Sequence, residues 1–176
     1  MTDESDHEAL PPDLVAAAMR RRAAGAAFDR LDPRRTALLA LNMQRAWVDA
    51  DAPFDRAGRS AAILPRINRL ARTQRMHGGT VAWLQMTAMP PGDPAYWSGY
   101  FDSFVREELR GSALAALAPG SARHALHADV ERAAADLVLP KSRFSAFLRN
   151  PHDLEAMLRE RGIDTVIVAG AATNVC

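Results

Sequence analysis

The chain's single cysteine, Cys176, follows a short run of apolar and β-branched residues. Residues 164–170 read Asp-Thr-Val-Ile-Val-Ala-Gly, which is typical of a buried strand in a parallel sheet. Ligands of α/β proteins bind at the carboxyl ends of such strands, beside the N-terminus of the next helix. Unpaired N–H groups and the helix dipole favour the thiolate there, and a thiolate attacks carbonyl carbon. A buried structural cysteine is the alternative interpretation, and the position at a strand end favours the nucleophile.

Two further candidate strands end in polar residues. Residues 36–42 are a nearly continuous apolar run that closes with Asn42, and residues 136–140 are followed by Lys141. Parallel strands bring their carboxyl ends to one edge of the sheet. We therefore expect Asn42, Lys141 and Cys176 to converge there, within reach of shared chemistry.

The elements that position these residues alternate between strand and helix. After Asn42, apolar residues recur at helical spacing; Pro65 fits the first helical turn, and Gly78-Gly79 ends the helix before a strand candidate at residues 80–85. Strand, helix and strand with short connections form a βαβ unit with a right-handed crossover. The sequence thus predicts an α/β fold of three layers, a mainly parallel sheet flanked by helices.

A single domain accounts for most of the chain. Its 176 residues, 48% of them hydrophobic, can bury one core. We expect an N-terminal helical extension at residues 1–35, helical from residue 13 to 29, and a domain at residues 36–176. Near the end of that domain, Asn150-Pro151 is expected to begin a further helix.

The composition limits the partners and the compartment. With 22 Lys and Arg against 21 Asp and Glu, the net charge is +1, which gives no reason to expect nucleic acid or a membrane surface as partner. One cysteine excludes a disulfide within the chain, and no apolar run reaches the roughly 20 residues of a membrane span. The expectation is a soluble, cytoplasmic protein.

Two other groups of residues leave alternatives open. Five aromatic residues lie between Tyr96 and Phe104, and they could form a lid over a pocket or a small core under a long insertion. His124 and His127 have a spacing that a metal site could use. Without a third ligand at usable spacing, we expect no metal and no cofactor.

Two late motifs resemble those of the isochorismatase-like cysteine hydrolases. They are Lys-Ser-Arg-Phe-Ser-Ala-Phe at residues 141–147 and Gly-Ala-Ala-Thr-Asn-Val-Cys at residues 170–176. The likeness extends from Thr36 to Cys176 and is nearest to the N-carbamoylsarcosine and ureidoacrylate amidohydrolases. It implies the isochorismatase-like hydrolase fold, a homo-oligomer (a dimer or a tetramer), and a small amide, carbamoyl or ureido substrate that releases ammonia.

The resemblance also implies a role for each site residue. Cys176 is the nucleophile that forms a thioester-type acyl-enzyme, Lys141 is the cation, and an aspartate base belongs at the position of Asn42. The N–H groups of Ala172 and Cys176 form the oxyanion hole, beside a cis bond between Ala171 and Ala172. Such a bond costs about 3–4 kcal/mol outside proline and persists only where a site enforces it.

Substrate contacts are implied at Trp47, Phe147 and Ala171. The metal-binding signature of the nicotinamidases is missing from residues 84–100, which argues against nicotinamide as substrate and again against a metal.

Asn42 departs from the family pattern. An amide has nearly the shape of a carboxylate but cannot accept the thiol proton. Either this copy has been disarmed, or a natural relative has lost or rerouted its chemistry; the first is favoured because every other motif residue is in place. Three hypotheses remain: a cysteine amidohydrolase with a weakened base, a vinyl-ether hydrolase of the isochorismatase type, and a catalytically silent binding protein.

The position of Cys176 as the last residue leads to one more expectation. If Cys176 opens a helix, the stabilising N–H groups belong to residues after it. We therefore expect the functional polypeptide to continue past Cys176, with the domain as given cut short at its C-terminal end.

Overall fold

The computed structural model describes residues 11–20, 30–55, 57–148, 152–172 and 175–176. The chain divides into two compact units, Met1–Leu31 and Asp32–Cys176. In the first unit the described residues hold one helix, α1 (Pro12–Arg20), whereas residues 21–29 of the expected N-terminal helix lie outside the described residues. The candidate site belongs to the second unit.

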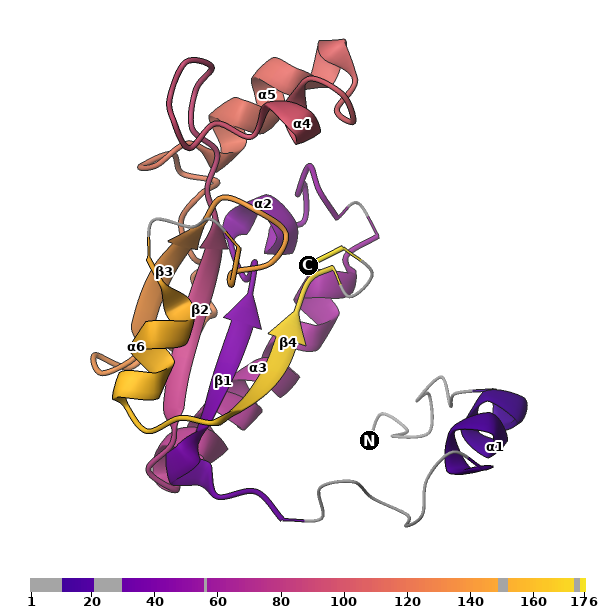
Figure 1. Cartoon of the computed structure of the whole chain (residues 1–176). Coiled ribbons are helices and arrows are strands. Elements are labelled where there is room, and N and C mark those ends of the chain that lie inside the picture. Colours follow the sequence, from indigo (N-terminus) through magenta and orange to yellow (C-terminus); the bar gives the residue numbers. More distant parts are fainter. Residues whose placement is uncertain (1–10, 21–29, 56, 149–151, 173–174) are drawn as a thin grey trace. The chain divides into compact units, whose positions relative to one another are not determined.

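A four-stranded parallel sheet forms the centre of this unit (Figure 1). Its strands are β1 (Thr36–Leu41), β2 (Thr80–Met86), β3 (Leu137–Lys141) and β4 (Thr165–Gly170). They lie in the order β3-β2-β1-β4, and all three pairings are parallel. The predicted α/β fold with a parallel sheet is confirmed, and each observed strand lies within a residue of its predicted position.

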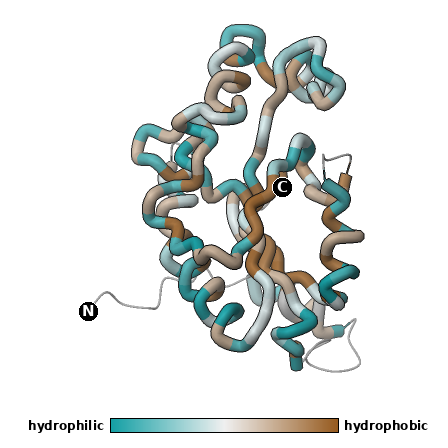
Figure 2. The backbone as a smooth tube through the Cα atoms, turned by 90° about the vertical axis from the view of Figure 1, so that its left-hand side faces the viewer, coloured by the Kyte–Doolittle hydropathy of each residue, from teal (hydrophilic) through white to brown (hydrophobic). Residues whose placement is uncertain are grey.

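Helices cover both faces of the sheet, which makes three layers. One face packs against α3 (Arg59–Met76) and the other against α6 (Leu154–Glu160) (Figure 1). All six residues of β1 are therefore buried, with Leu38 in the core under α3 and Leu39 in the core under α6. Figure 2 shows this as hydrophobic residues concentrated along the central strands. Burial on both faces explains the continuous apolar run in the sequence.

The start of one covering helix differs from the prediction. Helix α3 begins at Arg59, so the expectation that Pro65 lies in the first turn is wrong, and Pro65 sits inside the helix. The earlier start follows from Gly58, which has a φ of 68°, and from the Asp55 carboxylate, which accepts the Ser60 N–H. The Gly78 φ of 77° marks the predicted end of the helix.

Helix α6 begins at Leu154, where the Asp153 side chain accepts the Ala156 N–H at 2.9 Å. The expected start at residues 150–151 lies outside the described residues.

Three short helical segments lie beyond the carboxyl ends of the strands. They are α2 (Arg45–Val48), α4 (Ser98–Phe101) and α5 (Glu107–Leu117), and the last two belong to the long connection from β2 to β3 (Figure 1). Phe101 is buried in the main core, and Tyr100 packs against that core. Four of the five aromatic residues between 96 and 104 therefore belong to or pack against the main core, whereas Phe104 is 82% exposed.

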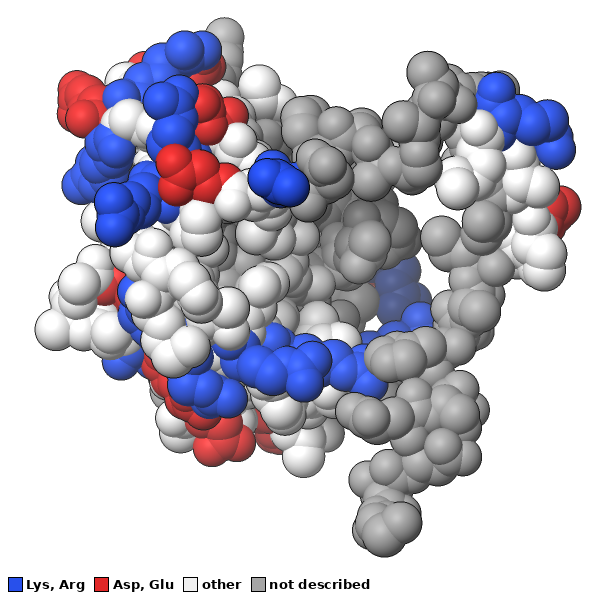
Figure 3. Space-filling view, turned by 90° about the horizontal axis from the view of Figure 1, so that it is seen from below, with Lys and Arg blue, Asp and Glu red and all other residues white. Residues whose placement is uncertain are grey.

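The surface carries charges of both signs. Seen from below, as in Figure 3, basic and acidic side chains lie next to one another. The ion pairs include Arg72 with Glu131 and Arg75 with Asp136. Among the described residues, no helix combines the length and the apolar character that crossing a membrane requires.

Candidate active site

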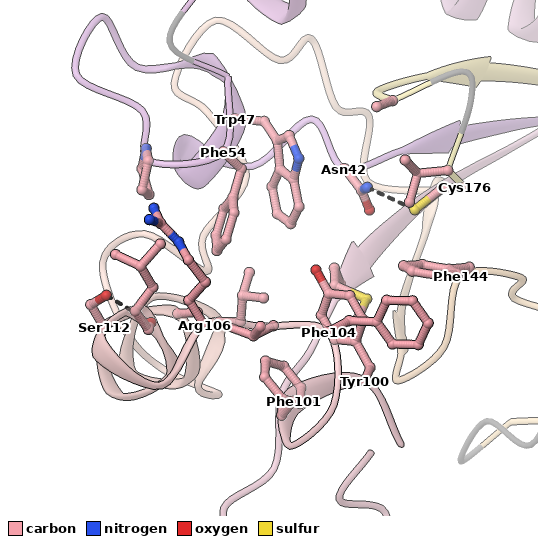
Figure 4. A pocket seen from close by; sticks show the side chains of 18 residues that line it. Asn42, Trp47, Phe54, Tyr100, Phe101, Phe104, Arg106, Ser112, Phe144 and Cys176 are labelled. Carbon is pink, nitrogen blue, oxygen red and sulfur yellow. Dashed lines mark hydrogen bonds between the residues drawn. The ribbon is translucent and has the colours of Figure 1, made fainter. Parts of the chain in front are cut away.

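The ends of three strands meet at the thiol of Cys176. Asn42 follows β1, Lys141 ends β3, and Cys176 follows β4. Both Asn42 Nδ2 and Lys141 Nζ lie 3.3 Å from Cys176 Sγ (Figure 4 shows the contact with Asn42). Each of these nitrogens carries protons that it can donate to sulfur, so the arrangement suits a negatively charged sulfur better than a neutral one.

Three hydrogen bonds hold Asn42, and one polar atom of its side chain has no partner among the described residues. Its side chain is 1% exposed, and its φ of 58° is one that asparagine tolerates better than most residues. The backbone N–H donates to Leu84 O at 2.9 Å, and Nδ2 donates to Ala171 O at 2.7 Å as well as to the thiol. Oδ1 is buried and accepts no hydrogen bond from the described residues. A buried acceptor without a partner is costly, and a ligand N–H could satisfy it.

Lys141 is fully buried at the same edge of the sheet. Besides the thiol, its ammonium group donates to Arg143 O at 3.3 Å and Phe144 O at 3.4 Å, and it contacts Met86 Sδ at 3.6 Å. Burial lowers the pKa of Lys141 from its ordinary value, whereas the contact with Cys176 acts in the opposite direction. The two carbonyl groups orient the charge toward sulfur.

The turn after β4 sets the position of the thiol. Gly170 lies opposite Leu41 of β1, and a Cβ at Gly170 would lie 2.2 Å from Leu41 O, so only glycine fits this close approach. The bond between Ala171 and Ala172 is cis. The Cys176 N–H donates to Ala172 O at 3.0 Å. One of the two N–H groups expected in the oxyanion hole, that of Cys176, is thus directed at the Ala172 carbonyl.

A pocket of about 480 Å³ opens from Asn42 and Cys176. A third of the residues in its wall are aromatic: Trp47, Phe54, Tyr100, Phe101, Phe104 and Phe144 (Figure 4). All six rings come from segments outside the sheet, including α2 and α4.

The expected substrate contacts have different positions around this pocket. Trp47 lies in the wall, where it stacks on Phe54 with 4.8 Å between ring centroids. Phe147 is 47% exposed and is not among the residues that line the pocket, whereas Phe144 is. Ala171 lines a smaller hollow beside Cys176 and accepts the Asn42 amide.

Phe144, Tyr100 and Arg106 are among the wall residues that the sequence did not identify as contacts. Phe144 lies within a quoted motif but was not singled out. Tyr100 belongs to the aromatic group whose role was left open; burial, and to a smaller extent Cys176, raises its pKa. Arg106 lines the same pocket, and nothing in the sequence distinguishes it from the other arginines.

The two histidines of the possible metal motif have separate partners. His124 Nε2 lies 2.8 Å from Thr87 Oγ1, and burial lowers the pKa of His124. His127 Nε2 lies 3.5 Å from an Asp49 oxygen. In the part of the chain that the structure describes, no three His, Cys, Asp or Glu side chains gather as ligands of one metal ion.

Comparison with known proteins gives concordant results. The isochorismatase domain matches residues 36–176. The ureidoacrylate amidohydrolase RutB of Klebsiella pneumoniae is 31% identical over 157 residues, which are 82% of this chain and 64% of the relative. The chain thus spans slightly less than two thirds of the length of that relative.

Solved structures of the same fold include two hydrolases. A cysteine hydrolase from Pseudomonas syringae pv. phaseolicola superposes with a TM-score of 0.70 at 22% identity, over 88% of this chain and 68% of that one. An N-carbamoylsarcosine amidase from Thermoplasma acidophilum has a TM-score of 0.62 at 21% identity, over 81% and 70%. By its domain match and by this identity to RutB, the chain belongs to the isochorismatase-like hydrolase family.

Proposed function

We propose that this domain is a cysteine-dependent amidohydrolase for a small amide, carbamoyl or ureido compound. The observation that carries the proposal is the pair of N–H donors, Asn42 Nδ2 and Lys141 Nζ, each 3.3 Å from Cys176 Sγ. The printed names of the relatives, ureidoacrylate amidohydrolase and N-carbamoylsarcosine amidase, support this substrate class.

The proposed reaction has two stages. The Cys176 thiolate attacks the amide carbonyl, the C–N bond breaks, and ammonia leaves with a proton while a thioester forms. Water then cleaves the thioester to the acid and restores the thiolate. Lys141 balances the negative charge on sulfur and on the tetrahedral intermediate.

Asn42 limits both stages in this chain. Ammonia needs a proton in order to leave, and the attacking water needs a base that removes one. Asn42 can supply hydrogen bonds but can neither hold nor return a proton. We therefore propose that the chain as given turns over slowly, as a copy with a disarmed base.

A catalytically silent binding protein is the second candidate, and Asn42 at the base position is the observation that favours it. A vinyl-ether hydrolase would leave the paired thiol of Cys176 without a role.

We also propose that residues 1–35 are an extension outside the hydrolase domain, since the family match begins at residue 36.

Ammonia release tests the proposal. Ureido acids, carbamoyl amino acids and maleamate are assayed with the original chain, with Asn42→Asp, and with Asn42→Ala as the matched variant that removes the amide without adding a carboxylate. We expect much faster release with Asn42→Asp than with the original chain or Asn42→Ala, and loss of this release when Cys176→Ala is added. Equal release with and without Cys176 would refute the cysteine mechanism. Ligand binding without any release would support the silent relative.

A further inference from the structure

The pocket contains a cation at a distance from the thiol. Arg106 directly precedes α5 and lines the same pocket as Cys176 and Asn42. Figure 4 places its side chain on the opposite side of the pocket from Cys176, near Phe54. Its guanidinium forms no ion pair with any carboxylate of the described residues, although Glu107 and Glu108 follow it in sequence. The planar N–H groups of a guanidinium match the two oxygens of a carboxylate.

The space between Arg106 and the thiol is apolar. Trp47, Phe54 and Phe101 contribute ring surface to it, and Leu109 and Ala113 come from α5. At about 480 Å³, the pocket falls within the range of about 300–1,000 Å³ that holds drug-sized ligands. An amide with only a few carbon atoms would leave most of this wall uncovered.

The end near the thiol offers hydrogen bonds to an amide group. Asn42 Oδ1 is buried and has no donor among the described residues, so it can accept an amide N–H. The Tyr100 side chain also lines the pocket, and its hydroxyl can donate or accept a hydrogen bond. These two groups suit a primary carboxamide or a ureido group whose carbonyl carbon lies at Cys176 Sγ.

We propose that the ligand of this pocket is an acid amide with a large apolar body, preferably an aromatic ring. The carboxamide or ureido group binds at Asn42 and Cys176, the ring packs against the aromatic wall, and a carboxylate at the far end pairs with Arg106. Arg106 then determines specificity for an anion. The assignment rests on the proposed function, because it places the reacting amide at Cys176.

Binding of matched probes tests the assignment. The dissociation constants of para-carboxyphenylacetamide, its methyl ester and succinamate are measured by calorimetry with the original chain. Since Arg106 is exposed, we expect the acid to bind about three- to tenfold more tightly than its ester, and this preference to fall as salt is added. Succinamate, which lacks the ring, should bind more weakly than either.

Variants locate the charge. Arg106→Gln should abolish the preference for the acid over the ester, Arg106→Lys should keep part of it, and Arg69→Gln, at an exposed position of α3, should leave it unchanged. Equal binding of acid and ester, a preference that survives in Arg106→Gln, or no binding of any ring compound would each overturn the assignment.

The two proposals can fail separately. Binding of the acid that depends on Arg106, with no ammonia from Asn42→Asp, would refute the hydrolysis and keep the anion subsite. Ammonia release that is the same with and without Arg106 would support the hydrolysis and refute the anion subsite.

Discussion

The two sides of the pocket are built in different ways. The polar side consists of residues at strand ends, with Asn42 and Lys141 at most 1% exposed and fixed by the pairing of neighbouring strands. Half of the rings on the aromatic side come from the connection between β2 and β3, where Phe101 is 1% exposed and Phe104 82%. Under the proposed function, the rigid sheet would hold the reacting groups, and the connection would contact the rest of the ligand.

Asn42→Asp should have the largest effect on the polar side. A carboxylate at this position can take and return a proton, so we expect turnover to rise by about 10²–10⁴. The ammonia assay measures the change as kcat. An unchanged kcat would show that the polar side is not a reaction centre, whereas ligand selection by the aromatic side could persist.

Phe101→Ala should test whether the aromatic side depends on the main core. Removal of a buried phenylalanine costs about 3–5 kcal/mol, because it loses hydrophobic burial and leaves a cavity. Urea unfolding provides the free energy, and Phe104→Ala, which truncates a mostly exposed ring, is the matched control and should cost little. Equal losses in the two variants would contradict the anchoring role of Phe101.

Lys141→Met should slow the alkylation of Cys176 by iodoacetamide at neutral pH. Hydrogen bonds to charged groups contribute about 1.5–3 kcal/mol, so losing one that favours the thiolate should lower the rate by roughly ten- to a hundredfold. Methionine preserves most of the buried volume. The Arg106→Gln variant serves as the control, since it changes a charge on the aromatic side; a comparable rate decrease there would mean that the two sides are not separate.

Substitution of His124, which contacts both the connection and the end of β2, should have the smallest effect, and this effect is on the pH dependence of stability. It belongs to the connection, yet its ring contacts Thr87 just after β2. Burial lowers its pKa, so the unfolded chain binds the proton more readily than the folded one. Stability should therefore fall as the pH drops from the ordinary histidine value of 6.5 toward the lower folded pKa. His124→Gln should reduce this fall in thermal unfolding between pH 7 and 5; a steeper fall in the variant would contradict it.

The sequence predicts the polar side well because strand ends follow from chain pattern. Apolar runs fix where β1, β3 and β4 stop, and parallel pairing then brings Asn42, Lys141 and Cys176 together. Gln44 is an exception: it also follows β1, but its amide accepts the Met86 N–H at 2.7 Å and donates to Met86 O at 3.1 Å, so it braces β2. A strand end alone does not tell which polar group faces the thiol.

The aromatic side could be predicted only in outline. Residues 142–148 have no helix or strand whose periodicity would tell which phenylalanine points inward, and the wall receives Phe144 where the resemblance implied Phe147. Nothing in the sequence identified Arg106 as a pocket residue either, because it is one of many arginines. Its position depends on how the connection packs over the sheet.

Lys141, which is buried beside the thiol, is also the only lysine in the sequence, and this has a practical consequence. Every other side-chain cation except histidine is an arginine, and arginine does not lose its proton in proteins. Biosynthetic incorporation of isotope-labelled lysine would thus place the side-chain resonances of a single lysine in a carbon spectrum. Its chemical shift, followed against pH, would report whether Lys141 is protonated beside the thiol. The measurement requires no chemical modification of Cys176.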